Sequence, residues 1–245
     1  MKVLIISHNP ITTYNNMGKT FLGLFSAFKQ EELCQLYVYP TIPDVRKCCS
    51  YFRITDKDVL RSYYKFKVKG REIQDVEIDE NKHDLFENKE DIEIYRNKKN
   101  KKPFRMLLRD LMWKCSHWST KELNSWLKKE NPSCVFVAPG TAKFLYDIAF
   151  KIAKKFNLPI VTYICDDYYF VKDKRCWIEK IQQRKLKKKI EQLMKRTSHI
   201  ITICDELKDI YGKKFQIPAT TIMTMPKNAA VKVLNIYFLL SVAAL

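Results

Sequence analysis

Two adjacent carboxylates, Asp166 and Asp167, directly follow the apolar run 160–165, and the aromatic residues Tyr168 to Phe170 come next. A carboxylate beside a buried strand is costly unless it is solvated, bound to a partner or used in a reaction. Adjacent side chains point apart, so these two do not form a general acid–base pair. We expect Asp166 to face the ligand as the catalytic residue. Asp167 either binds substrate or caps a helix, and the aromatic rings, Tyr168 foremost, either stack on a sugar ring or pack in the core.

Polar residues also follow other apolar runs. His8 ends the first run of the chain, the loop behind it reaches Asn16 and Gly18, and Gly140 follows the run CVFVA. Ligands of open parallel sheets bind at the carboxyl ends of the strands, so we expect His8, Asn16 and Gly140 to contact substrate. A structural role is the alternative for His8. Gly18 either permits a tight turn into the following helix or brings its backbone close to a phosphate of a cofactor.

The tripeptide Gly18-Lys19-Thr20 has the ending of a P-loop but not its beginning. A P-loop needs a second glycine five positions before Gly18, and Thr13 stands there instead. The first apolar run is also not followed by the GxGxxG pattern of dinucleotide-binding sites. The sequence therefore excludes the usual ATP, GTP and dinucleotide sites.

Apolar runs alternate with segments of helical periodicity along most of the chain. The predicted strands are 3–7, 36–41, 51–54, 134–138, 160–165, 199–204 and 220–224. The predicted helices are 18–29, 56–64, 104–113, 119–131, 142–156, 177–196 and 205–212. This alternation predicts an α/β fold with a doubly wound, Rossmann-like parallel sheet. The strongly polar segment 65–102 has no sustained period, and we interpret it as a surface insertion.

Three helix ends carry recognisable signals. Asp56 stands where it can cap the helix over 56–64, and Ser119 with Glu122 has the spacing of a capping box. Gly212 is expected to end the last predicted helix as its C′ glycine. The nearly continuous apolar run Val3 to Ser7 is only five residues long, which is too short for a secretory signal.

The charge balance suggests anionic partners. Lysine and arginine exceed the acidic residues to give a formal net charge of +18, which attracts nucleic acid, anionic lipid or phosphorylated substrates. The predicted helix 177–196 carries basic residues over an apolar stripe. It is either a membrane-surface helix or a core-packed helix with a solvated basic face. We do not expect a specific nucleic-acid site, because the basic residues are not interleaved with exposed aromatics.

Cysteine usage indicates reduced thiols in a cytoplasmic protein and no metal site. The eight cysteines contain no CxxC pair, and the four histidines are scattered. Four of the cysteines lie in or beside apolar runs, as buried thiols do: Cys34, Cys134, Cys165 and Cys204.

In their order along the chain, these segments resemble the amino-terminal domain of GT-B glycosyltransferases, specifically family-4-like bacterial enzymes. The matching stretches are KVLIISHNP with MGKTF, YFRITDKDVL, WLKKENPSCVFVAPG, IAKKFNLPIVTYICDDYYF and SHIITICDELKDIYGKKFQIP. The resemblance implies a hexosyltransferase-type activity in surface polysaccharide synthesis, with no metal and with a sugar or lipid-linked acceptor held by this domain. Gly18 would match a loop glycine near the donor diphosphate, and Asp166 would lie near the donor sugar.

The same resemblance predicts a domain over 1–226 and a tail over 227–245 that begins a missing donor-binding domain. In such enzymes the nucleotide-sugar donor is bound by the second domain, so we expect this domain to bind no cofactor alone. We therefore expect a truncated or separately encoded half enzyme that is inactive by itself, located in the cytoplasm or at the inner face of the membrane. The alternative is a non-catalytic module that binds nucleic acid or a membrane surface.

Overall fold

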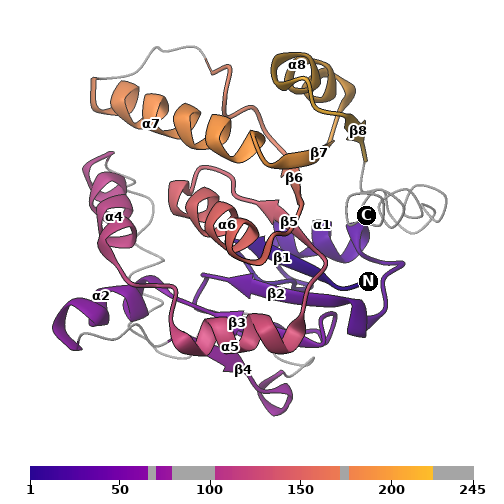
Figure 1. The fold of residues 1–245 in the computed structure, drawn as a ribbon, viewed down its shortest axis with the longest axis vertical. Helices are drawn as coiled ribbons and strands as arrows, with labels where there is room; N and C mark the ends of the chain where they lie inside the picture. The colour runs from indigo at the N-terminus through magenta and orange to yellow at the C-terminus, as the bar shows by residue number, and fades with distance from the viewer. Residues whose placement is uncertain (66–69, 79–102, 172–176, 223–245) are drawn as a thin grey trace.

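The computed structural model describes residues 1–65, 70–78, 103–171 and 177–222 (Figure 1). Eight strands form one sheet in the order β4-β3-β2-β1-β5-β6-β7-β8. The strands are β1 (Val3–Ser7), β2 (Leu33–Tyr37), β3 (Ser50–Arg53), β4 (Arg71–Ile73), β5 (Cys134–Ala138), β6 (Ile160–Ile164), β7 (Thr197–Thr202) and β8 (Ala219–Thr221). Each neighbouring pair is parallel except β3 with β4, which is antiparallel. The predicted doubly wound α/β sheet is confirmed, with one antiparallel strand added at its edge.

Helices cover both faces of the sheet. They are α1 (Asn16–Leu24), α2 (Asp56–Lys65), α4 (Pro103–Cys115), α5 (Lys121–Glu130), α6 (Lys143–Phe156), α7 (Trp177–Met194) and α8 (Asp205–Phe215). Two short 3₁₀ turns, Gln30–Glu32 and Asp75–Glu77, complete the described elements. Residues of α1 pack in the core cluster on one face, and residues of α4 to α8 pack in the cluster on the other.

The central strands are apolar throughout because both of their faces are buried. In β1, Leu4 and Ile6 belong to the core under α4–α8, whereas Val3 and Ile5 belong to the core under α1. Successive strand residues point to opposite faces, so a strand covered on both sides must be apolar at every position. On the α1 side, the ring of Phe25 meets that of Phe136 edge-on at 4.9 Å.

The three predicted helix-end signals are displaced by one to four residues. Thr55, not Asp56, caps α2: its amide donates to the Asp58 carboxylate at 2.8 Å, and its hydroxyl accepts from the Asp58 amide at 3.1 Å. Thr120, not Ser119, caps α5. Gly212 does not end α8, which continues to a left-handed cap at Gln216 (φ 57°).

Packing does not require a glycine at position 212. A Cβ there would lie 3.4 Å from the Cβ of Ala219, which is an ordinary van der Waals contact. The glycine that looks like a helix stop in the sequence is therefore an interior residue of α8 that faces β8.

Besides α8, three predicted elements differ in extent by three residues or more. The first helix ends at Leu24, β2 lies at 33–37 instead of 36–41, and β8 ends at Thr221. The segment 65–102 is not wholly irregular, because β4 and a 3₁₀ turn lie within it. Residues 66–69 and 79–102 of that segment, and the tail 227–245, lie outside the described residues.

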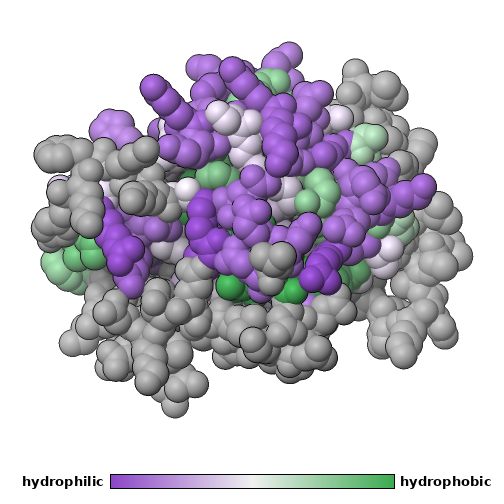
Figure 2. Space-filling view, turned by 90° about the horizontal axis from the view of Figure 1, so that it is seen from below, coloured by the Kyte–Doolittle hydropathy of each residue, from purple (hydrophilic) through white to green (hydrophobic). Residues whose placement is uncertain are grey.

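The surface seen from below is largely hydrophilic, with small separate hydrophobic spots (Figure 2). Within the part of the chain that the structure describes, no helix is long and apolar enough to cross a membrane. The predicted basic helix is present as α7, and its inner face is buried through Leu186, Ile190 and Leu193. Its core-packed interpretation is thus confirmed for the inner face.

Candidate functional site

The predicted site residues emerge from one edge of the sheet. In the parallel register, Ser7 of β1 pairs with Ala138 of β5, and Val137 of β5 pairs with Thr162 of β6. The segments that carry His8, Gly140 and Asp166 therefore leave three neighbouring strands on the same side. This carboxyl edge is where open α/β sheets bind ligands.

Gly140 and Tyr168 are brought together at this edge. Gly140 has a positive φ of 55°, which favours glycine, and a Cβ there would lie 3.8 Å from the Tyr168 hydroxyl. The hydroxyl of Tyr146 donates to the Gly140 carbonyl oxygen at 2.7 Å and fixes this turn. Burial, followed by the nearby Cys165 thiol, raises the pKa of Tyr168 well above its usual value, so its hydroxyl stays protonated at neutral pH.

The two aspartates differ in their surroundings. Asp167 is half-buried, and its Oδ1 accepts from the amides of Tyr169 at 3.1 Å and Phe170 at 2.9 Å and from the Tyr211 hydroxyl at 3.2 Å. These bonds make Asp167 the residue that shapes the turn after β6. Asp166 is exposed, and its Oδ1 accepts only from the Asp167 amide at 2.9 Å among the bonds described. Asp166 therefore presents an exposed carboxylate at the edge, and its catalytic role stays a prediction.

His8 is held in a defined protonation form. Its Nε2 lies 3.1 Å from Nη2 of Arg109, and its Nδ1 lies 3.0 Å from Oδ1 of Asn9. A guanidinium only donates hydrogen bonds, so Nε2 accepts and carries no proton in this arrangement. The proton then resides on Nδ1 and is donated to Asn9.

Arg109 is part of a network that the sequence patterns do not reveal. Its Nε donates to Asp56 at 3.0 Å, and the indole nitrogen of Trp113 donates to the same carboxylate oxygen at 2.6 Å. The Trp113 ring stacks on the Phe144 ring at a centroid distance of 4.3 Å. The Arg109 guanidinium lies 4.8 Å from the centroid of the Phe144 ring. Asp56 of α2 and Phe144 of α6 each lie more than thirty positions from Arg109 in the sequence, so no local spacing could indicate these contacts.

A second ion pair lies beside this network. The ammonium of Lys143, at the buried start of α6, lies 2.6 Å from the Asp110 carboxylate and donates to the side-chain oxygen of Gln182. Burial raises the pKa of Asp110, and Lys143 opposes that shift. The pair ties α4, α6 and α7 together behind the carboxyl edge.

Gly18 and Asn16 lie at the start of α1, after the β1 loop. A Cβ on Gly18 would come within 2.5 Å of the Thr12 amide nitrogen, and its own amide donates to the capping Asn15 side chain at 2.6 Å. These contacts explain the glycine by tight packing of the loop on the helix. Asn16 is exposed as the first helical residue. The ligand-binding roles of both residues stay predictions.

The thiols and other possible metal ligands form no metal site among the described residues, where no group of three such side chains could hold an ion. Cys34 and Cys134 are buried as expected, whereas Cys165 and Cys204 are only half-buried. Cys204 stands at the N-cap position of α8, and no side-chain capping bond forms there.

No family model matches the chain, and a search of the curated proteins found no match. Two solved structures of Phytolacca americana UGT2 are similar, the apo form and a complex with UDP-2fluoro-glucose and pterostilbene. Each is 7% identical with a TM-score of 0.44, and the alignments cover 91% and 94% of this chain. They cover 52% and 54% of the UGT2 chains, so this chain spans about half the length of the structures it matches. Likeness at this level assigns neither a family nor an activity.

Proposed function

We propose that this chain is the acceptor-side domain of a nucleotide-sugar-dependent glycosyltransferase that acts in surface polysaccharide synthesis. One observation carries the proposal: polar groups from the ends of β1, β5 and β6 share one edge of a doubly wound sheet. The order of sequence segments that resembles family-4-like enzymes adds support. The net charge of +18 suits a phosphorylated donor and a lipid-linked acceptor.

The proposed chemistry gives the edge residues distinct roles. In glycosyl transfer, an acceptor hydroxyl attacks the anomeric carbon, the bond to the nucleoside diphosphate breaks, and the acceptor proton needs a base. Asp166 takes that proton, since its carboxylate is exposed at the edge. The Tyr168 hydroxyl orients the acceptor by a hydrogen bond, and His8, whose two ring nitrogens bond to Asn9 and Arg109, contacts the acceptor with its ring.

The donor is held elsewhere in this proposal. The resembled enzymes bind the nucleotide sugar on a second domain that faces the acceptor domain across a cleft. We therefore propose that this domain works at the cytoplasmic side with a donor-binding half, and that it transfers no sugar alone. Asn16, Gly18 and Asp167 would then line the side of the cleft that this chain supplies.

Acceptor binding tests the proposal without a donor half. The purified chain is applied to an array of bacterial oligosaccharides, together with the variants Asp166→Asn and Tyr168→Ala. We expect binding to a subset of glycans, weakened about tenfold or more by Tyr168→Ala because a ring contact is lost. Asp75→Asn is the matched control, because Asp75 is an exposed carboxylate at the opposite edge. An array on which neither the protein nor any variant binds would count against the acceptor role.

Donor turnover tests the second part. The chain is incubated with a panel of nucleotide sugars and the glycans it binds, and release of nucleoside diphosphate is followed. We expect no release above the protein-free rate. Efficient release by the chain alone would contradict the need for a separate donor-binding half and leave the acceptor site in place.

A further inference from the structure

Helix α4 exposes an apolar stripe to solvent, while two of its charged side chains make bonds inside the molecule. Its inner face carries Arg109 and Asp110, which bond to His8, Asp56 and Lys143. Its outer face carries Phe104, Leu108 and Leu111, at i, i+4 and i+7, with exposed fractions of 68%, 58% and 56%. A surface helix normally turns this pattern the other way, with its apolar stripe toward the core.

Neighbouring helices extend this apolar surface. The helices α2 and α7 both contact α4. Leu60 of α2 is half exposed, Trp177 at the start of α7 is 70% exposed, and Ile181 lies one turn further along. We call the following six residues the outer patch: Leu60, Phe104, Leu108, Leu111, Trp177 and Ile181. They account for six of the ten large apolar side chains that are exposed among the described residues.

The outer patch lies on the side of the molecule that carries the carboxyl edge. In this fold the helices run back against the strands, so α6 and α7 begin where the strands end. Figure 1 shows α2, α4 and the first turns of α6 and α7 together on the left side of the ribbon. A surface that meets the patch therefore also meets the rim that carries Gly140 and Asp166.

The exposed charges around the patch are predominantly basic. Exposed lysine and arginine side chains on the three helices are Arg61, Lys114, Lys180, Arg184, Lys185 and Lys188. The carboxylates of α2 and α4 make internal bonds: Asp56 with Arg109, Asp58 with Thr55 and Asp110 with Lys143. Apolar side chains ringed by cations, with a tryptophan among them, match the chemistry of an anionic lipid surface.

We propose that the outer patch docks this protein on an anionic membrane surface, with Trp177 and the α4 side chains in the headgroup region. The basic residues of α7 contact the lipid phosphates. The docking goes beyond the proposed sugar transfer and does not depend on it. It would hold the carboxyl edge close to the plane in which lipid-linked molecules lie.

Vesicle flotation tests the docking directly. The full chain is mixed with vesicles of phosphatidylcholine and phosphatidylglycerol, or of phosphatidylcholine alone. We expect flotation with the anionic vesicles that falls as salt is raised. The double variant Arg184→Gln/Lys188→Gln should lower the partition coefficient by roughly thirtyfold, as expected for two basic residues at the surface. Leu108→Ser/Leu111→Ser should lower it by about tenfold or more, with an unchanged circular dichroism spectrum.

A matched control separates docking from net charge. Lys154 and Lys213 are exposed lysines in the last turns of α6 and α8, at the far edge of the sheet. Lys154→Gln/Lys213→Gln removes the same charge as the α7 double variant, and we expect it to change flotation by less than about threefold. Equal decreases in vesicle flotation for the α7 double variant and this control would overturn the proposed docking surface.

The tryptophans supply an independent readout. Trp113, Trp118 and Trp126 are at most 5% exposed, so Trp177 is the accessible indole. We expect brominated phosphatidylcholine in anionic vesicles to quench part of the emission, and Trp177→Phe to abolish that quenching. Unquenched emission, or binding to a single-stranded oligonucleotide that replaces vesicle binding, would overturn the proposal. Neither flotation nor quenching involves sugar transfer, so a failure of the docking proposal can be distinguished from a failure of the glycan-binding proposal.

Discussion

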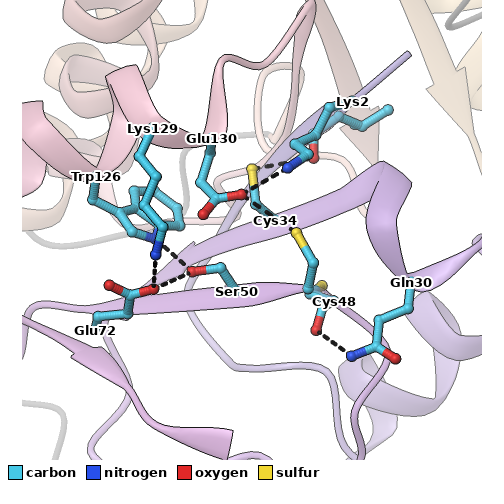
Figure 3. Close-up of polar contacts among 11 residues, drawn as sticks. Lys2, Gln30, Cys34, Cys48, Ser50, Glu72, Trp126, Lys129 and Glu130 are labelled. Carbon is cyan, nitrogen blue, oxygen red and sulfur yellow. Dashed lines mark hydrogen bonds and ion pairs between the residues drawn. The ribbon is translucent and has the colours of Figure 1, made fainter.

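The two edges of the sheet both gather polar side chains, but they use them differently. At the amino edge, Lys2 pairs with Glu130 at 2.8 Å (Figure 3). The Cys49 thiol donates to the same carboxylate at 3.3 Å. At the carboxyl edge, Asp166 stays exposed. The Glu130 carboxylate makes internal bonds, whereas the Asp166 carboxylate remains accessible to a ligand.

A second series of hydrogen bonds at the amino edge also leaves its polar groups bonded to one another. The Trp126 indole nitrogen donates to the Ser50 hydroxyl at 2.6 Å, and that hydroxyl donates to Glu72 at 2.9 Å (Figure 3). Glu72 also accepts from Lys129 at 3.2 Å. The contrast teaches that a cluster of charged residues does not by itself mark a site. The informative feature is a polar group at the strand ends that the fold leaves in contact with solvent.

The largest expected effects come from one tryptophan at each edge. Trp113 stacks on Phe144, and Trp126 lies 5.4 Å from the Phe52 ring; both are nearly fully buried. We expect Trp113→Ala and Trp126→Ala each to lower the free energy of unfolding by about 3–5 kcal/mol in urea titrations. Only Trp113→Ala should also weaken glycan binding. It removes the hydrogen bond from the indole to Asp56, and Asp56 in turn positions Arg109, which bonds to His8. Equal glycan binding by the two variants would erase the contrast between the edges.

The ion pairs of the two edges should differ in strength. The side chain of Glu130 is 5% exposed, whereas those of Asp56 and Arg109 are 21% and 29% exposed. We expect Glu130→Gln to cost about 2 kcal/mol of unfolding free energy, because a buried, charge-assisted bond is lost. Arg109→Gln should cost about 1 kcal/mol or less, since solvent screens the more exposed pair. The reverse order, measured by the same titrations, would mean that the carboxyl-edge pair is structural.

The smallest effect concerns the reactivity of Cys49. Burial, and next the negative charge of Glu130, raise the pKa of its thiol. A raised pKa lowers the thiolate fraction at neutral pH, so alkylation by iodoacetamide should be slower than at the exposed Cys115 and should accelerate as pH rises. In Glu130→Gln the pKa of the Cys49 thiol should fall, and its alkylation rate should increase a few-fold. Peptide mass spectrometry measures both sites, and a Cys49 rate unaffected by this substitution would argue that the thiol does not feel Glu130.

The sequence indicates the buried framework well because burial on both faces forces continuous apolar runs. The strands β1, β5, β6 and β7 were predictable for this reason, and with them the edge that carries His8, Gly140 and Asp166. The strand β4 was missed because it has three residues, of which Ile73 alone is buried. A short edge strand leaves no periodic signal.

The missed parts of the site depend on contacts between distant segments. Arg109 reaches His8 across 101 positions and Asp56 across 53, so only the folded chain brings them together. The outer patch was missed for a related reason. The apolar spacing of α4 predicts a helix, but only the packed structure shows that Leu108 and Leu111 face outward.

Hydrogen exchange with a bound glycan tests the central claim most directly, that the carboxyl edge holds the acceptor. The chain is exchanged with and without the oligosaccharide that binds best on the array, and the amides are compared by mass spectrometry. We predict slower exchange in segments 139–146 and 165–171 and unchanged exchange in the amino-edge segments 46–53 and 126–134. Slower exchange at the amino edge, with no change at the carboxyl edge, would contradict the account.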